Sequence, residues 1–193
     1  MSFEQIAASV FVFYIAGSES STSTVAYTMY ELTQNVEIMK RAQKDIKDTL
    51  NKFNGEITYE SINEMKFIDL CVKETNRKYP GLPILNRECT KDYRIPGSNY
   101  IIKQGTAIII SLLGIHTDAQ YFPEPEKYDP DRFTDEKHAY NEDAFIPFGD
   151  GPRSCIGNKN RKKYPLNIIV LNYLCSFPFT FHPIPSQHKT LHF

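Results

Sequence analysis

Hydrophobic and polar positions divide the chain into a helical first part and a second part of short extended runs. From Phe3 to about Thr33, apolar residues recur with no proline and a single glycine, which predicts one long helix. Its segment Ile6–Gly17 is apolar almost throughout, yet it is too short to span a bilayer and has no basic flank. We therefore expect this segment to be a buried helix.

Two shorter helices are predicted next. Asn35 can cap a helix over residues 36–50, and Gly55 ends that region. A third helix is expected from Asn63 to Lys78, before Pro80. The apolar faces expected for these helices contain Ile38, Ala42 and Ile46 in the first, and Phe67, Leu70, Cys71 and Thr75 in the second.

After these helices the pattern changes to short β-branched runs at residues 93–96, 99–103 and 106–111, separated by Pro-Gly and Gln-Gly turns. A proline-rich stretch, residues 121–133, is expected to be ordered coil. The apolar segment Leu166–Phe177 is compatible with either a helix or a buried strand. The pattern predicts one mainly α domain over residues 1–193 with a small β region.

Composition argues against two broad classes, disordered chains and nucleic-acid-binding proteins. The chain has 193 residues, 41% hydrophobic content and a net charge of −1, so it can form an ordered core and is not a nucleic-acid binder by charge. Its four cysteines show no Cys-x-x-Cys spacing, and no secretory signal precedes them. Reduced thiols are therefore expected.

One cysteine lies in an unusual setting, the stretch FIPFGDGPRSCIG at residues 145–157. Glycines before and after Cys155 allow the backbone to approach a flat partner closely, and Pro147 and Pro152 stiffen the loop. Arg153, two residues before the sulfur, favours a thiolate over a thiol. The stretch therefore predicts a rigid loop that presents a thiolate.

Several interpretations of Cys155 are open. A cysteine is often only a small buried hydrophobe, but the glycines, prolines and arginine argue against that here. A zinc site needs further ligands at short spacing, which His138 and Cys175 do not supply. A catalytic cysteine needs a paired base, which the sequence neither shows nor excludes. A single protein thiolate is typical of haem-thiolate iron.

The stretch Phe148–Gly157, FGDGPRSCIG, resembles the haem-binding loop of the cytochrome P450 family. The family pattern is matched at all five positions, Phe148, Gly151, Arg153, Cys155 and Gly157. The resemblance implies haem b as the cofactor and Cys155 as its axial ligand and metal-binding residue. It also implies that Phe148 packs near the sulfur and that Arg153 pairs with a haem propionate.

Two further motifs follow in the family's order. Glu74 and Arg77, in E-T-N-R, lie three residues apart on one face of the third helix, a spacing that by itself is common on exposed helices. The segment D-P-D-R-F adds Arg132. The resemblance implies a buried structural triad of Glu74, Arg77 and Arg132 that holds the cysteine loop.

The first helix contains A-G-S-E-S, residues 16–20, which is similar to the family's oxygen-activation stretch. The resemblance implies that Glu19 and Ser20 are catalytic and relay protons. A serine stands where the family more often has threonine, and its hydroxyl still donates and accepts. His116 and Arg87 lie in segments that also resemble the family. For both residues we expect structural hydrogen bonding and no catalytic role.

The resemblance covers residues 1 to about 157 and is nearest to microsomal, insect-detoxification members. It corresponds to the C-terminal two-fifths or so of a complete enzyme, so we expect a fragment that lacks the N-terminal membrane anchor and exposes apolar surface. The tail after Gly157 diverges. Arg161 stands where the family has a small residue, and Pro165 is suited only to the start of a helix. The basic residues of the tail, Lys159, Arg161, Lys162 and Lys163, are candidates for a face that binds an acidic redox partner.

The implied function is haem-dependent monooxygenation: one oxygen atom from O2 enters a small apolar substrate, with electrons from NADPH-cytochrome P450 reductase and with cytochrome b5 as a further donor. The implied role is xenobiotic metabolism at the cytosolic face of the endoplasmic reticulum membrane. Two alternatives stay open. The chain could be a truncated, non-catalytic haem-binding remnant, or an interaction fragment that binds no haem stably.

Overall fold

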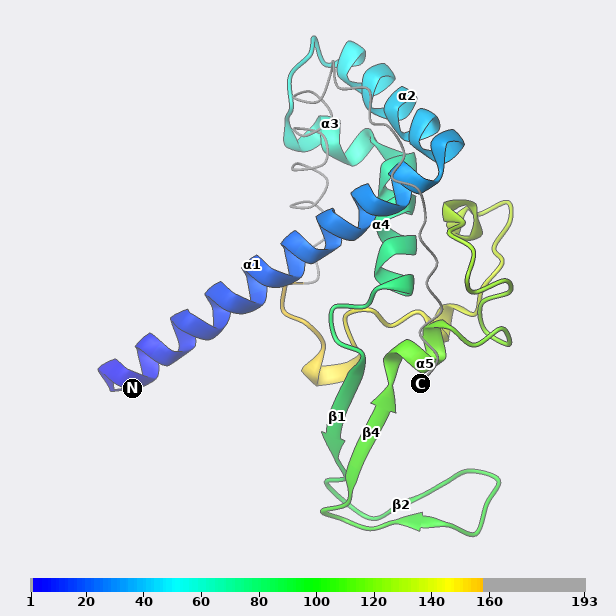
Figure 1. Cartoon of the computed structure of the whole chain (residues 1–193). Helices are drawn as coiled ribbons and strands as arrows, with labels where there is room; N and C mark the ends of the chain where they lie inside the picture. The colour runs from blue at the N-terminus through cyan, green and yellow to red at the C-terminus, as the bar shows by residue number, and fades with distance from the viewer. Residues whose placement is uncertain (1, 158–193) are drawn as a thin grey trace, which may run out of the picture.

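A long helix opens the fold. The computed structural model describes residues 2–157, and its first element is α1, Phe3–Gln34 (Figure 1). The Ser2 hydroxyl accepts a hydrogen bond from the Gln5 amide, and the Gln5 side chain accepts one from the Ser2 amide. This reciprocal cap satisfies amides that a helix N-terminus otherwise leaves without a partner. The predicted long helix is confirmed.

Helix α2, Val36–Lys52, begins after the single non-helical residue Asn35. Asn35 lies at the predicted boundary, but its side chain does not cap α2. Instead, the side-chain amide nitrogen Nδ2 donates to the backbone carbonyl of Glu31 at 2.8 Å. The prediction of an Asn35 side-chain cap is therefore wrong, because the side chain is turned back to donate to the preceding helix and its oxygen accepts from no amide of α2. The buried residues of α2 recur at helical spacing and are Ala42, Ile46, Thr49 and Leu50.

The third predicted helix, residues 63–78, is two helices in the structure. Helix α3, Tyr59–Glu64, and helix α4, Lys66–Lys78, are separated at Met65, which has an extended ψ of 78°. The start of α3 is fixed by Thr58, whose hydroxyl accepts from the backbone three residues later. The predicted start at residue 63 is therefore wrong, and the predicted end at residue 78 is confirmed.

A side chain from another helix caps α4. The Asp45 carboxylate, on α2, accepts hydrogen bonds from the amides of Phe67 at 2.8 Å and Ile68 at 3.2 Å. These are amides of the first turn, where a negative charge is also favoured by the helix dipole. The break before α4 is thus stabilised by a tertiary contact that the local sequence does not reveal.

The hydrophobic core lies where the C-terminal half of α1 meets α2, α3 and α4 (Figure 1). On α4 the buried face differs in part from the prediction: Cys71 and Thr75 are fully buried, whereas Phe67 and Leu70 are only partly buried. Ile68 takes the central position in their place. The core residues are Val25, Leu32, Ala42, Ile46, Leu50, Ile62, Met65, Ile68, Cys71, Val72 and Tyr128.

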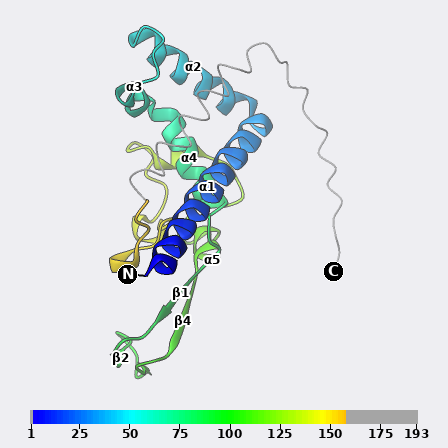
Figure 2. The ribbon, with the colours of Figure 1, turned by 90° about the vertical axis from the view of Figure 1, so that its left-hand side faces the viewer.

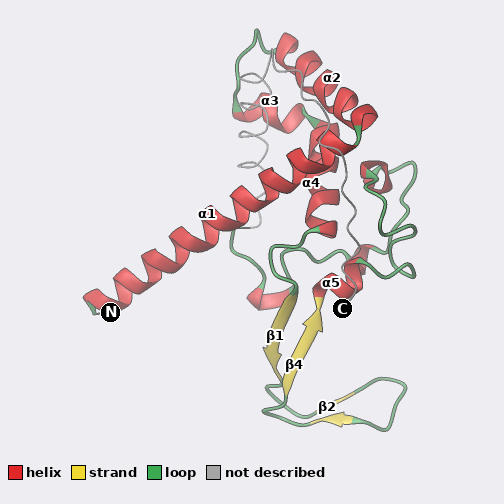
Figure 3. Cartoon of the chain, in the orientation of Figure 1, coloured by secondary structure: helices red, strands yellow, loops and turns green. Residues whose placement is uncertain are grey.

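The β region is a pair of two-stranded antiparallel sheets that extends away from the helices (Figure 3). One sheet pairs the long strands, with Asn86 opposite Ile109, and the other closes the tip of the hairpin. The three predicted strand regions each contain a strand, but the first strand of the hairpin was not predicted. The bounds are β1 Ile84–Glu88, β2 Tyr93–Arg94, β3 Ile101–Ile102 and β4 Ala107–Ser111.

The segment after β4 runs back to the helices. It begins with the short helix α5, Leu112–His116, and continues through the proline-rich stretch, which is coil apart from one 3₁₀ turn. The ordered coil predicted there is confirmed. The 3₁₀ turns of this part of the chain are η1 Pro130–Phe133, η2 Glu142–Ala144 and η3 Gly151–Arg153.

The N-terminal half of α1 is exposed, which contradicts the prediction of a buried helix at Ile6–Gly17. Figure 1 shows this half extending away from the other described elements, and in Figure 2 it points toward the viewer. Phe11 and Phe13 are 63% and 64% exposed. Apolar residues all round a helix indicate that it can be buried, but burial also needs neighbours, and the described residues supply none here. Expected exposure of apolar surface is, by contrast, confirmed.

In the described part of the chain, no helix is long and apolar enough to cross a membrane. The interpretation of Leu166–Phe177 as helix or strand, the helix start at Pro165 and the basic face at residues 159–163 all lie outside the described residues.

Candidate functional site

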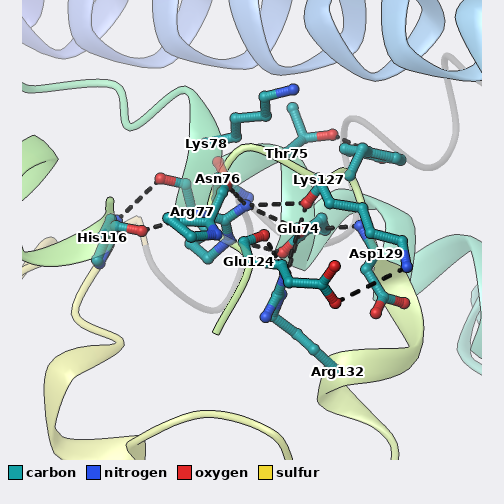
Figure 4. Close-up of polar contacts among 12 residues, drawn as sticks. Glu74, Thr75, Asn76, Arg77, Lys78, His116, Glu124, Lys127, Asp129 and Arg132 are labelled. Carbon is teal, nitrogen blue, oxygen red and sulfur yellow. Dashed lines mark hydrogen bonds and ion pairs between the residues drawn. The ribbon is translucent and has the colours of Figure 1, made fainter. Parts of the chain in front are cut away.

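A fully buried cluster of charges lies between α4 and η1. The guanidinium of Arg77 donates to both oxygens of the Glu74 carboxylate, from Nε at 2.8 Å and from Nη2 at 2.9 Å. Arg132 donates from Nε to Glu74 Oε1 at 3.2 Å. None of the three side chains is more than 2% exposed. The structure therefore brings the predicted triad together (Figure 4).

The two arginines use their remaining donors on backbone carbonyls. Arg77 donates from Nη2 to the Pro125 carbonyl at 2.7 Å, and Arg132 donates from Nη1 to the Pro123 carbonyl at 2.8 Å. The backbone amide of Asp129 donates to Glu74 at 3.0 Å. Because buried charges are tolerated only when paired and hydrogen-bonded, this arrangement fixes the coil of residues 123–129 against α4.

A chain of buried hydroxyl groups joins α1 to the same region. Thr28 donates to Thr75 Oγ1 at 2.9 Å, and Thr75 lies 3.0 Å from the hydroxyl of Tyr128. Tyr128 in turn donates to the Cys71 carbonyl at 2.7 Å. These contacts fix the C-terminal half of α1, just after Ser20, against α4 and the coil.

His116 contacts the triad and the cysteine loop. Arg77 donates from Nη1 to the His116 carbonyl at 2.8 Å, and the His116 ring bonds to the Arg77 carbonyl and to the Ile146 amide. Burial, together with the nearby Arg77 charge, lowers the pKa of His116 to about 4. The imidazole is therefore neutral at physiological pH, and the structural role expected for His116 agrees with these contacts.

The cysteine loop is held by backbone bonds and by glycine conformations. The Cys155 amide donates to the Phe148 carbonyl at 2.9 Å, which closes the loop around η3. Gly149 and Gly151 have φ values of 68° and 73°, in the left-handed region that favours glycine. Two of the glycines noted in the sequence therefore have a conformational reason to be there.

Cys155 and Cys71 differ in their surroundings. Cys71 is 0% exposed in the core, and burial raises the pKa of its thiol. Cys155 is only half-buried, and its neighbour Ile156 is 80% exposed. An apolar side chain exposed beside an accessible sulfur is an arrangement suited to covering by a flat apolar partner.

The residues of the loop fit a haem with one protein ligand. Gly157 lies beside the sulfur, since a Cβ atom added there would be 3.7 Å from Cys155 Sγ, in ordinary van der Waals contact. Within residues 2–157, no group of three or more His, Cys, Asp or Glu side chains is placed to hold a metal ion. A lone sulfur does not suit zinc, which takes about four ligands, but it suits haem iron, whose other ligands come from the porphyrin.

The other predicted site residues lie in different positions. Phe148 is half-buried, whereas Arg153 is exposed, which leaves its guanidinium accessible to an anionic group. Arg87, on β1, lies beside the loop, because a Cβ at Gly149 would be 3.4 Å from its Nη2 atom. Its guanidinium donates to the Asn86 carbonyl at 2.9 Å, in agreement with the expected structural hydrogen bonding.

Glu19 and Ser20 lie on α1, at the border between its exposed and buried halves. Glu19 is exposed, and the Ser20 hydroxyl donates to the Ala16 carbonyl one turn earlier. In the described residues, no hydrogen bond or ion pair joins either side chain to Cys155. The structure therefore does not bring the predicted relay into direct contact with the sulfur.

Two contributors to the site were not predicted from the sequence. The Asp129 amide and the Tyr128 hydroxyl bind the triad region from the proline-rich coil. The only sequence signal was their position at the start of the D-P-D-R-F motif, of which Asp129 is the first residue and Tyr128 the residue before it. A backbone donor carries no residue signature. Contacts of this kind depend on the path of the chain, which the pattern of residues does not give.

A rigid glycine loop that presents one sulfur, held near a buried Glu-Arg-Arg cluster, is the arrangement of the haem-thiolate class of proteins. The family model described as Cytochrome P450 matches residues 1–160. The chain belongs to the cytochrome P450 family, whose members are haem-thiolate monooxygenases.

Relatives and a solved structure agree with this assignment. The chain is 58% identical over 159 residues to "Probable cytochrome P450 6d4" of Drosophila melanogaster, covering 82% of this chain and 31% of that protein. It is 48% identical over 200 residues to "Cytochrome P450 6d3" of Musca domestica, covering 100% of this chain and 37% of that protein. The structure matches the "cytochrome P450DA heme domain" with a TM-score of 0.79 and 25% identity, over 90% of this chain and 38% of that one.

The chain therefore spans about a third of the length of these curated relatives. The alignment with the Musca relative runs over the whole chain, so it includes the tail that the sequence analysis set apart as divergent. The family fold, mainly helical with a small antiparallel region, is confirmed by the match to the solved haem domain.

Proposed function

We propose that this chain carries the haem-ligand part of a monooxygenase that inserts one oxygen atom from O2 into a small apolar substrate. The observation that supports this most is the half-buried Cys155 on a loop closed by its own backbone and held near the buried Glu74 and Arg77. When bound, haem supplies the activation of O2, one atom entering the substrate and the other leaving as water after two electrons and two protons are taken up.

The chain's own residues have distinct roles in this proposal. The half-buried Cys155 would supply the sulfur that binds the haem iron, the half-buried Phe148 would pack beside it, and the exposed Arg153 guanidinium would pair with a propionate. Gly151 permits the left-handed turn that precedes the ligand. Glu74, Arg77 and Arg132 are structural, since every donor described for them is used on the protein itself.

Proton supply is assigned to α1. The Glu19 carboxylate is exposed and can exchange protons with water, and the Ser20 oxygen keeps lone pairs free to accept a proton while its hydrogen is donated to Ala16. The two side chains are adjacent in sequence at the border of the exposed half of α1. Their role is to pass protons toward the substrate side of the site.

The electron donors and the cellular location are inferred from membership of the family. We infer that electrons come from NADPH-cytochrome P450 reductase, with cytochrome b5 as a further donor, and that the complete protein acts at the cytosolic face of the endoplasmic reticulum membrane. The similarity to insect proteins of the P450 6d group supports a role in xenobiotic metabolism.

Oxygen labelling tests this function directly. The haem-loaded chain is incubated with reductase, NADPH, ¹⁸O2 and naphthalene as an apolar probe, and Cys155→Ala is treated in the same way. Labelled hydroxylated product from the parent and none from the variant is the expected result. Labelled product from both proteins, or from neither, contradicts the proposal.

A second candidate function is a haem-binding remnant without turnover. The exposed apolar half of α1 favours it, because Phe11, Phe13 and Ile15 have no described neighbours that would enclose a substrate. Haem uptake that depends on Cys155, combined with no labelled product and no substrate-dependent NADPH consumption, is the result this second candidate predicts.

A further inference from the structure

The His116 ring is hydrogen-bonded on both of its nitrogens. Nδ1 lies 3.1 Å from the carbonyl of Arg77, and Nε2 lies 3.3 Å from the backbone nitrogen of Ile146. The ring is 0% exposed and packs against Phe122 and Phe145, with centroids 5.6 Å and 5.7 Å away. Both its position and its orientation are therefore fixed.

These two contacts define one tautomer. An amide can only donate, so Nε2 must accept from Ile146 and carry no proton. A carbonyl can only accept, so Nδ1 must carry the proton and donate it to Arg77. The neutral ring with its proton on Nδ1 is the one form that satisfies both neighbours.

The contact with Arg77 is reciprocal. The Arg77 guanidinium donates to the backbone carbonyl of His116 at 2.8 Å, while the His116 ring donates to the backbone carbonyl of Arg77. Figure 4 shows the two residues facing each other with both contacts drawn. Because Arg77 is also held by the Glu74 carboxylate, the ring is connected to the buried charge cluster.

On its other side, the ring reaches the start of the cysteine loop. The Ile146 amide is shared, since it also lies 3.2 Å from the Ala144 carbonyl. From Ile146, backbone bonds continue through the loop: Gly149 donates to the Ile146 carbonyl at 2.9 Å, and Cys155 donates to the Phe148 carbonyl at 2.9 Å. A displacement at Ile146 is thus transmitted toward the sulfur.

We propose that His116 is the positioning residue that holds the cysteine loop in place relative to the buried triad. The inference deepens the proposed function, on which it rests for the role of Cys155. The neutral ring donates toward the triad and accepts from the loop, so it sets where the loop begins and, through the loop's backbone bonds, where the sulfur lies. His116 touches neither the substrate nor the sulfur.

Three variants separate hydrogen bonding from packing. His116→Phe keeps an aromatic ring against Phe122 and Phe145 but removes both bonds. His116→Gln keeps one amide donor and one carbonyl acceptor, so it can restore both bonds without the ring. His138→Phe is the matched control, because His138 is exposed and, in the described residues, its ring makes no hydrogen bond to Arg77 or Ile146.

Two readouts are measured on each variant. Amide hydrogen exchange of the peptide at residues 145–149, without haem, is expected to rise about fivefold in His116→Phe, the equivalent of one lost hydrogen bond, and less than about twofold in His116→Gln and His138→Phe. With haem, the fraction of the reduced carbon monoxide complex that shows the thiolate Soret band is expected to fall at least about twofold in His116→Phe and to recover in His116→Gln.

Equal exchange in all three variants, or an equal loss of the thiolate band in His116→Phe and His116→Gln, overturns the proposal. A parent with no thiolate band contradicts the proposed function and not this inference, which the exchange experiment still decides. If His116→Phe does not fold, ¹⁵N NMR of the parent decides instead. A proton on Nδ1 and none on Nε2 supports the proposal, and the opposite tautomer overturns it.

Discussion

The buried charge cluster and the cysteine loop are neighbours that are built in opposite ways. Glu74 and Arg77 are 0% exposed, and their charges are paired with each other and with backbone groups. The cysteine loop is half-exposed, depends on two left-handed glycines and offers a sulfur to the outside. The charge cluster fixes the chain through buried ion pairs and hydrogen bonds, whereas the loop leaves the Cys155 sulfur accessible. His116 is the connection between them.

The residues that stabilise the fold at this site are therefore different from the cysteine that we propose as the haem ligand. Substitutions in the cluster should therefore cost free energy of unfolding, and substitution of Cys155 in the loop should cost haem ligation with little change in stability.

The largest effect is expected for Glu74→Gln. The change leaves the buried guanidinium groups of Arg77 and Arg132 without a negative partner, which should cost about 3 to 5 kcal/mol in the free energy of unfolding. Urea unfolding followed by circular dichroism measures this. The matched control is Glu37→Gln, whose pair with Lys40 is exposed and should contribute less than about 1 kcal/mol. Equal losses in the two variants would contradict the assigned role of the cluster.

The next effect concerns pH. The pKa of His116 is lowered from 6.5 to about 4 in the folded chain, chiefly by burial. The unfolded chain therefore binds the proton first as pH falls, and the folded chain loses roughly 3 kcal/mol between pH 6.5 and pH 4 from this group. Above pH 6.5 the contribution is fully present.

Unfolding free energies of the parent and His116→Gln, measured at several pH values, test this. The difference between the two should shrink as pH falls from 6.5 to 4, because glutamine does not titrate. A difference that stays constant over this range would show that His116 does not carry the acid sensitivity.

A smaller effect is expected in the loop backbone. Gly149→Ala places a side chain at a φ of 68° and should cost about 1 to 2 kcal/mol. Its added Cβ would lie 3.4 Å from Arg87 Nη2 and 3.7 Å from Leu85 Cδ1, which are ordinary van der Waals distances, so conformation and not crowding is the cause. Gly157→Ala is the control, since Gly157 does not have a left-handed φ. Thermal unfolding measures the stability of both variants. An equal loss of stability in Gly157→Ala and Gly149→Ala would contradict this explanation.

Much of the helical fold could be predicted from the sequence, because its signals are local. Amphipathic spacing identified α2, and the absence of proline identified α1. Strand β1 was missed because its pairing partner β4 begins nineteen residues after it ends, and strand formation depends on that partner. The division between α3 and α4 was missed because its cap, Asp45, comes from another helix.

The site was predictable to the extent that it uses side chains in recognisable motifs. Cys155, Glu74 and Arg132 were identified in that way, and the structure brings the triad together. The backbone donor of Asp129 has no sequence signature. The buried helix expected at the start of α1 was wrong because amphipathicity and hydrophobicity describe what a helix can bury, and the neighbours decide what it does bury.

The smallest change in stability and the largest change in chemistry are expected for the same substitution, Cys155→Ser. The half-buried sulfur is exchanged for an oxygen of similar size, so the free energy of unfolding should change by about 0.5 kcal/mol or less. Serine does not provide a thiolate, so ligation should be lost.

The most direct test of this account is the reduced carbon monoxide difference spectrum of the haem-loaded parent and of Cys155→Ser, recorded with their unfolding free energies. We predict a red-shifted thiolate Soret band in the parent, none in the variant, and free energies of unfolding that differ by about 0.5 kcal/mol or less between the two haem-free proteins. A thiolate band in the variant, or no such band in the parent, would contradict the assignment of Cys155 as the haem ligand.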